Sequence, residues 1–300
     1  MNCKLRKMLF ILLMAIFLCT GGLLISRLVD AHSAAKTNNL AQTLANVPTD
    51  TIPPESIHAA ETPYTDPTES IQETTLPTEE ELPDANALRL LNWDIASLQE
   101  VNPEVIGWIL LPDTQINYPL LHTKDNETYL NTAWDGSYSV SGSIFLETRN
   151  DPALSDYNTL IYGHNMRNGS MFAPLMGYKD AQFLEANPNI YIATADSVHR
   201  YTVFAAYEAS VVSDTYRLIF NSPARKQLAL NSYLERSQWE PPLTPTIRDH
   251  ILTLSTCTGT GQYETRWVVQ AVRTGSWDNE KAGFPQETSF QDEIISPQEP

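Results

Sequence analysis

The chain has 300 residues, with 19 basic and 36 acidic side chains and a net charge of −17 at pH 7. Four of the basic residues and one of the acidic residues lie within the first thirty positions, so the remainder is still more acidic. This balance argues against nucleic acid or an anionic surface as the partner, because both attract basic proteins. The length allows one or two domains.

The N-terminus predicts a membrane-spanning signal anchor. Three basic residues among the first seven precede an uncharged apolar run from Met8 to Ile25. Such a run is roughly 27 Å long as a helix, which just spans a bilayer. We therefore expect a cytoplasmic N-terminus over 1–7, a transmembrane helix over 8–27 and everything after it outside the cell membrane. A cleaved signal peptide is the alternative, because the small residues Ser33–Ala35 follow the run.

The composition changes after the apolar run. Residues 28–84 are dominated by Thr, Pro and Glu, and large apolar side chains are sparse. Such a segment buries too little apolar surface to offset the entropy of ordering, so we expect a disordered stalk. A globular domain follows over 85–276, and residues 277–300 form a polar C-terminal tail.

The globular part is predicted to be mainly β. Asp94 is expected to cap a short helix that ends at Glu100, before Asn102-Pro103. Short apolar or β-branched runs separated by turns then follow, and they indicate a closed β-barrel or a sandwich. The runs are Ile106–Leu111, Gln115–Leu120, Gly142–Leu146, Thr159–Tyr162, Asn189–Thr194, Tyr201–Val212, His250–Ser255 and Arg266–Arg273.

Two helical insertions are expected among these strands. Met171–Glu185 has helix-forming composition that is interrupted near Gly177. Ala224–Ser237 is a stronger helix, because Ser222 supplies an N-cap and Pro223 fits the first turn.

Cys257 is the residue with the clearest chemical potential. The other cysteines, Cys3 and Cys19, lie before or within the apolar run, so no disulfide is expected and the thiol is free to react. His164 follows a predicted strand, Cys257 ends another, and Arg266 begins the next. Three such side chains at strand ends of a barrel can converge at one rim, where they would suit acyl transfer through a thioester.

These residues also carry a family resemblance. Thr253-Leu254-Ser255-Thr256-Cys257 with the following Arg266 resembles the sortase signature, and His164 within Tyr-Gly-His-Asn-Met matches the histidine of that family. Asn102–Ile109, Ile116–Pro119, Gly142–Leu146 and the helix inserted before the cysteine strand resemble class B sortases. The resemblance spans about residues 93–273 and implies a closed eight-stranded sortase-like β-barrel with a few short helices.

The resemblance implies a membrane-anchored cysteine transpeptidase of a monoderm bacterium. Its partners would be secreted proteins with a C-terminal sorting signal and an amine acceptor of a peptidoglycan precursor or a pilin. His164, Cys257 and Arg266 would be catalytic, and no cofactor is implied. Substrate-binding positions carried over from the family are Asn126, Leu130, Tyr162, Ser255 and Thr256, with Tyr216 as a weaker candidate.

Other functions were weighed on the same residues. An L,D-transpeptidase would place Arg almost next to Cys, and a papain-like peptidase would place Cys before His on a helix, whereas this chain does neither. A sortase substrate would end in a hydrophobic segment and a basic tail, but this chain ends in an acidic and polar stretch. A non-catalytic surface-binding domain on a stalk remains an alternative that leaves the three side chains unexplained.

Overall fold

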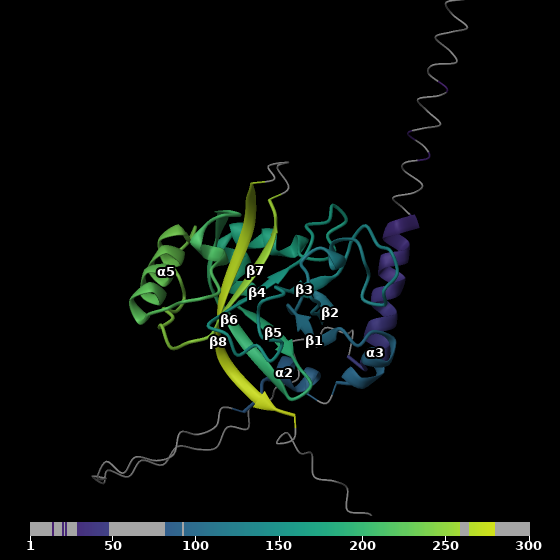
Figure 1. The fold of residues 1–300 in the computed structure, drawn as a ribbon, viewed down its shortest axis with the longest axis horizontal. Coiled ribbons are helices and arrows are strands. Elements are labelled where there is room, and N and C mark those ends of the chain that lie inside the picture. The colour runs from purple at the N-terminus through teal and green to yellow at the C-terminus, as the bar shows by residue number, and fades with distance from the viewer. Residues whose placement is uncertain are drawn as a thin grey trace, which may run out of the picture.

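The fold is a closed β-barrel of eight strands (Figure 1). The computed structural model describes residues 29–47, 82–91, 93–258 and 264–279, with the single positions 14, 20 and 22. Around the barrel the strands run in the order β1-β2-β3-β4-β7-β8-β6-β5, and β5 pairs with β1 to close it. Their bounds are β1 Val105–Leu110, β2 Asn117–Leu121, β3 Ile144–Leu146, β4 Asn158–Tyr162, β5 Asn189–Ala193, β6 Ser197–Ser210, β7 Ile251–Cys257 and β8 Thr265–Asp278. The eight expected strands and the barrel are thus confirmed, and the sandwich is not formed.

The pairing of β4 with β7 is parallel, although most neighbouring strands are antiparallel. The register runs from Asn158 opposite Ile251 to Tyr162 opposite Ser255. Because the two strands point the same way, the residues that follow them emerge at the same end of the barrel.

A series of buried, hydrogen-bonded side chains from four strands fixes this register. The Thr253 hydroxyl donates to Asn158 Oδ1 at 2.7 Å and accepts from Gln270 Nε2 at 3.1 Å. The Tyr207 hydroxyl donates to Gln270 Oε1 at 2.9 Å. A slip of one residue would leave these buried groups unpaired, which costs about 1–3 kcal/mol for each group.

Alternation along the strands separates an inner from an outer face. Leu252 and Leu254 of β7 belong to the cluster that fills the barrel. Ile251 belongs to a second cluster on the outer face, which the helix α5 covers. Thr253, Ser255 and Cys257 share the parity of Ile251, so they lie on that outer face.

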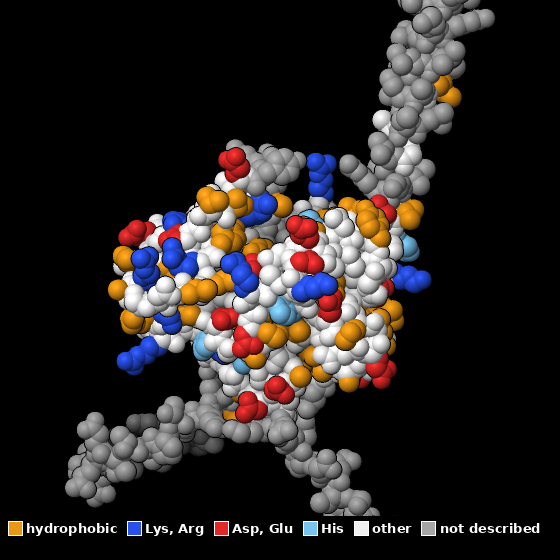
Figure 2. Space-filling model, in the orientation of Figure 1, with side chains coloured by type: hydrophobic (Ala, Val, Ile, Leu, Met, Phe, Trp, Pro, Cys, Tyr) orange, Lys and Arg blue, Asp and Glu red, His pale blue; other side chains and the backbone are white. Residues whose placement is uncertain are grey.

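The helices are short, as expected from the sequence. Asp94 caps α3 (Ile95–Val101), and Ser222 caps α5 (Pro223–Arg236) by accepting from Arg225 N–H, so both caps are confirmed. The expected helical segment Met171–Glu185 forms a 3₁₀ helix and α4, and the break between them lies at Asp180, three residues after the expected interruption at Gly177. The remaining elements are α2 Ala85–Leu90, η1 Thr128–Leu130, η2 Ala173–Lys179, α4 Ala181–Ala186 and η3 Asp214–Tyr216. Several basic side chains are visible at the left of Figure 2, in the region where Figure 1 shows α5.

Residues 29–44 form a helix, where the sequence predicted the start of a disordered stalk. This helix lies beside the barrel, near α3 (Figure 1). Ala41 and Ala45 are completely buried. The remainder of the predicted stalk up to residue 81, and the tail from residue 280, lie outside the described residues.

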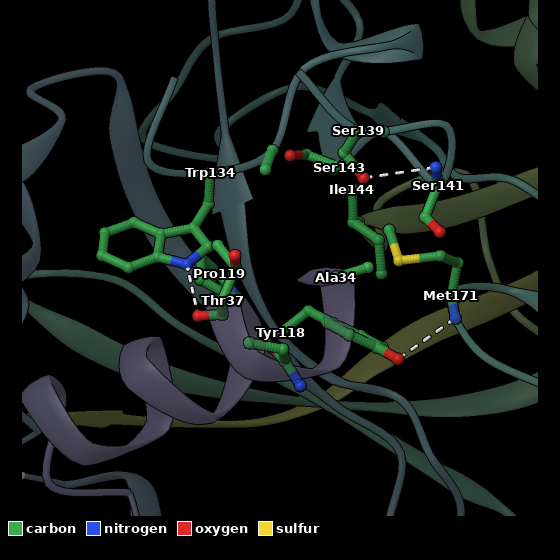
Figure 3. Close-up of a pocket in the computed structure, with 13 residues that line it drawn as sticks. Ala34, Thr37, Tyr118, Pro119, Trp134, Ser139, Ser141, Ser143, Ile144 and Met171 are labelled. Atoms are coloured by element: carbon green, nitrogen blue, oxygen red, sulfur yellow. Dashed lines mark hydrogen bonds between the residues drawn. The ribbon is translucent and has the colours of Figure 1, made fainter. Parts of the chain in front are cut away.

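Hydrogen bonds connect the helix to Trp134 and to Asn117 of β2. Trp134 Nε1 donates to the carbonyl of Thr37 at 2.9 Å (Figure 3). The side-chain amides of Asn38 and Gln42 donate to the carbonyl of Asn117, at 3.5 and 3.2 Å. The short alanine side chains allow the close approach that these bonds require, which explains why a segment with few large apolar residues is nevertheless ordered.

The expectation of a single-pass membrane protein with an external catalytic domain is corrected by the structure. Among the described residues, none of the helices combines the length and the apolar character that crossing a bilayer requires. Most of the predicted spanning segment, residues 8–27, lies outside the described residues.

The docking of this helix can be tested with a buried and an exposed substitution. Ala41→Glu places a carboxylate in the helix–barrel contact, where burying an unpaired charge is costly. We expect amide hydrogen exchange in residues 31–44 to accelerate at least roughly tenfold, because 1.4 kcal/mol already corresponds to that factor. Thr43→Glu, at an exposed position of the same helix, should leave exchange nearly unchanged. Equal protection in both variants would contradict the docked helix.

Candidate active site

Cys257 and Arg266 are direct neighbours across an antiparallel strand pair. Cys257 is the last residue of β7, and it lies opposite Arg266 in β8. Opposed side chains of such a pair have their Cβ atoms about 4.5–5.5 Å apart on the same face. Cys257 is a free, exposed thiol. The register of one hairpin therefore brings a guanidinium beside a reactive sulfur.

His164 reaches the same place from β4. Gly163 N–H donates to Ser255 O at 3.3 Å, and Asn165 Nδ2 donates to Cys257 O at 2.9 Å, so the chain after β4 runs along the end of β7. Gly163 is needed at this point, because a Cβ there would lie 2.7 Å from the ring of Phe172. The predicted convergence of the three side chains is thus found, on the outer face of the barrel at the end of β7.

The orientation of the imidazole follows from a backbone acceptor. His164 Nε2 lies 2.8 Å from the carbonyl oxygen of Leu130. A carbonyl only accepts, so Nε2 carries the hydrogen and Nδ1 is the nitrogen that can exchange a proton. The Leu130 carbonyl is itself held by tight packing, because Gly142 has φ +57° and a Cβ there would lie 2.7 Å from that oxygen.

The thiol and the imidazole shift each other's pKa in opposite directions. The hydrogen bond with His164 lowers the pKa of Cys257, burial opposes this, and the positive charge of Arg266 adds to the lowering. The hydrogen bond with Cys257 raises the pKa of His164, burial opposes this, and the bond to Leu130 adds to the raising. Both shifts favour a thiolate beside an imidazolium, which is the reactive form of such a pair.

A cleft of about 520 Å³ surrounds the three side chains. The substrate-binding positions expected from the sequence all line it: Asn126, Leu130, Tyr162, Ser255 and Thr256. Tyr216 of η3 lines it as well. Its hydroxyl lies 3.0 Å from the Ser255 hydroxyl, which links η3 to the strand that carries the cysteine.

Thr256 contributes to the cleft differently from its neighbours. It faces Trp267 across the strand pair, and Trp267 belongs to the cluster inside the barrel. By alternation, the Thr256 side chain points to the side opposite Cys257. Its hydroxyl is buried, so only its backbone is placed to meet a ligand in the cleft.

The sequence analysis did not identify two charged side chains at the cleft, Arg149 and Glu147. Arg149 lines the cleft, and the carboxylate of Glu147 lies beneath it at 2.7 Å from Nε. Glu147 is only 2 % exposed. The segment Glu147-Thr148-Arg149 follows a strand and has the polar composition of an ordinary loop, so nothing in its pattern signals a buried carboxylate.

Comparisons with known proteins point to one family. The sequence model described as Sortase domain matches residues 109–274. A similar curated protein is Sortase B of Listeria monocytogenes, 36 % identical over 182 residues that cover 59 % of this chain and 72 % of that protein.

Solved structures agree with this similarity. Sortase B from B. anthracis in complex with AAEK1 has a TM-score of 0.63 and 28 % identity, and the match covers 83 % of this chain and 99 % of that one. A Staphylococcus aureus sortase B-substrate complex has a TM-score of 0.57 and 29 % identity, and the match covers 63 % of this chain and 86 % of that one.

The pKa shifts predict how fast Cys257 is alkylated as the pH changes. Iodoacetamide reacts with the thiolate, so the rate rises through the thiol pKa, and we expect its midpoint below the ordinary value of about 8.5. His164→Ala should move the midpoint upward, and Arg266→Gln should move it upward by less, because the hydrogen bond with His164 is the largest cause of the lowering.

The measurement is mass spectrometry of the peptide that contains Cys257, since Cys3 and Cys19 would also react. Arg225→Gln, in α5 outside the cleft, is the matched control and should leave the midpoint unchanged. A midpoint that is the same in the wild-type protein and in His164→Ala would contradict the proposed coupling.

Proposed function

The chain belongs to the sortase family as a class B cysteine transpeptidase, and from that premise we propose that Cys257, His164 and Arg266 carry its reaction. The reaction is cleavage of a sorting signal near the C-terminus of a secreted protein, followed by transfer of the new acyl end to an amine. The observation that carries the proposal is the register that sets Cys257 opposite Arg266, with His164 lining the same cleft.

In the first half-reaction the Cys257 thiolate attacks the carbonyl carbon of the scissile peptide bond. Negative charge then develops on the carbonyl oxygen, and the fixed positive charge and donors of Arg266 are placed to stabilise it. Arg266 Nη1 donates to the Thr265 carbonyl at 2.9 Å, which limits the freedom of the guanidinium. As the C–N bond breaks, His164 gives its Nδ1 proton to the leaving amine, and a thioester remains on Cys257.

In the second half-reaction an amine attacks the thioester. Neutral His164 accepts the proton of the incoming amine at Nδ1, the C–S bond breaks, and Cys257 leaves as a thiolate that the new imidazolium stabilises. A new amide bond forms, so the cycle returns to its starting state. The bond from Nε2 to the Leu130 carbonyl serves both steps, because it keeps Nδ1 toward the thiol.

The acceptor amine is proposed to belong to a peptidoglycan precursor or to a pilin. Two details of the cleft favour a peptide as the other substrate. Its lining residues come from several strands and loops, and the hydroxyls of Ser255 and Tyr216, 3.0 Å apart, belong to residues that line the same cleft as the thiol. The L,D-transpeptidase and the non-catalytic binding domain are not favoured, because the family match covers the strands that carry all three side chains.

Peptide capture tests the proposed roles. The family resemblance implies cleavage after Thr. The protein is therefore incubated with a library of peptides that contain Thr directly before the intended scissile bond and with a triglycine acceptor, and adducts and products are identified by mass. Cys257→Ala should abolish both the thioester adduct and cleavage. Arg266→Gln should lower kcat by roughly 10²–10³, the usual effect of removing an oxyanion donor.

His164→Ala separates the two halves of the scheme. Loss of the proton donor should leave slow formation of the adduct, while ligation to triglycine falls below detection. A Cys257→Ala protein that still cleaved a peptide of the library would refute the proposed function.

A further inference from the structure

Glu147 is a buried carboxylate that the proposed reaction does not use. It follows β3, it is 2 % exposed, and it accepts three hydrogen bonds: from Arg149 Nε at 2.7 Å, Asn126 Nδ2 at 2.9 Å and the Tyr162 hydroxyl at 2.9 Å. Burial raises the pKa of Glu147, but the three hydrogen bonds outweigh burial and hold the pKa below its ordinary value. The carboxylate is therefore ionised at neutral pH.

The Glu147 carboxylate fixes the orientation of two side chains that line the cleft, Asn126 and Tyr162. Asn126 donates through Nδ2 to Glu147 and accepts through Oδ1 from Thr148 N–H at 2.9 Å, so its amide cannot flip. The Tyr162 hydroxyl donates its hydrogen bond to the same carboxylate. A ligand that enters this part of the cleft therefore meets side chains with defined orientations.

Arg149 is the exposed member of the group. Its side chain is 67 % exposed and lines the cleft, while its Nε is paired with Glu147 below. The two terminal nitrogens have no hydrogen-bond partner among the described residues. Because Glu147 is buried, a ligand meets the positive end of the pair and not the negative one.

Positive groups outnumber negative ones around the cleft. Among the described residues that line it, Arg149, His164 and Arg266 can be positive, none is Asp or Glu, and the Cys257 thiolate is the single group that can be negative at neutral pH. The chain as a whole has a net charge of −17. A cationic cleft in an acidic protein favours an acidic ligand group and disfavours a basic one.

The pairing of the strands places Glu147, the partner of Arg149, relative to Cys257. Phe145, Tyr162 and Ser255 lie side by side in β3, β4 and β7. Glu147 lies two residues beyond this row in one direction, and Cys257 lies two residues beyond it in the other. Four residue steps of ~3.3 Å along the strands and two strand spacings of ~4.8 Å separate the backbones of Glu147 and Cys257 by about 16 Å, the reach of four or five residues of extended peptide.

We propose that Arg149, paired with the buried Glu147, is a specificity-determining residue that binds a side-chain carboxylate of the sorting signal, four or five residues from the scissile bond. The inference rests on the proposed function, because it needs a peptide extended through the cleft to Cys257. The terminal nitrogens of Arg149 match a carboxylate with two parallel hydrogen bonds.

A panel of peptides tests this assignment. One peptide that the wild-type protein cleaves is taken from the library, and the fourth and fifth residues on each side of the scissile bond are changed in turn to Asp, Asn and Lys. We expect kcat/KM for the Asp peptide to be roughly tenfold higher than for the Lys peptide at one of these positions. The difference should lie mainly in KM, as for a charge-assisted hydrogen bond in a partly exposed cleft.

Variants of Arg149 assign the preference to this residue. Arg149→Ala should make the Asp and Lys peptides nearly equal, and Arg149→Glu should reverse their order. Arg149→Lys should retain part of the preference, because it keeps the charge but not the planar fork. Arg225→Ala, an exposed basic side chain of α5 outside the cleft, is the control and should preserve the wild-type ratio.

The outcomes separate the two proposals. If the wild-type protein cleaves no peptide of the library, the proposed function fails before any preference can be measured. If it cleaves peptides with equal efficiency for Asp and Lys at every one of these positions, or if Arg149→Ala keeps the wild-type ratio, the assignment of Arg149 is overturned while the proposed function stands.

Discussion

The parallel pairing of β4 with β7 is the constraint on which the site depends. Nearly ninety residues separate the two strands in the chain, yet Tyr162 lies opposite Ser255. His164 follows the first strand by two positions, and Cys257 ends the second. The contact between the two side chains therefore depends on the register of β4 and β7. Hydrogen bonds among the buried side chains of Asn158, Thr253 and Gln270 fix that register. Complete burial of these three side chains makes the pairing specific, because each alternative pairing leaves a polar group unsatisfied.

The site combines side chains placed by strand pairing with electrostatics that favour the charged forms of the thiol and the imidazole. Strand pairing supplies the guanidinium beside the sulfur, and the carbonyl of Leu130 supplies the orientation of the imidazole. The pKa shifts are consequences of that geometry, since the thiol and the ring stabilise each other's charged forms. A neutral carbonyl holds His164, so the ring remains able both to give and to take a proton during the two transfers.

Sequence reasoning found the elements whose patterns are local. Apolar runs bounded by turns predicted the eight strands, and the caps at Asp94 and Ser222 are chemical signals within a few residues. The convergence of His164, Cys257 and Arg266 was predictable because all three flank strand ends. The burial of Glu147 was not predictable, since it depends on partners from distant segments. The helix 29–44 was not predictable either, because the segment around its alanines is rich in Thr, Pro and Glu, a composition typical of disorder. The single-pass membrane location, inferred from one apolar run, is not supported by the described helices.

The most direct measurement of the central claim is a crystal structure of the protein with a peptidyl group captured on Cys257. The account predicts that the thioester carbonyl oxygen faces the Arg266 guanidinium within hydrogen-bond distance. It also predicts that His164 Nδ1 faces the thioester while Nε2 keeps its bond to the Leu130 carbonyl. A captured acyl group with Arg266 turned away from its oxygen, or with His164 beyond hydrogen-bond reach of the reacting atoms, would contradict the account.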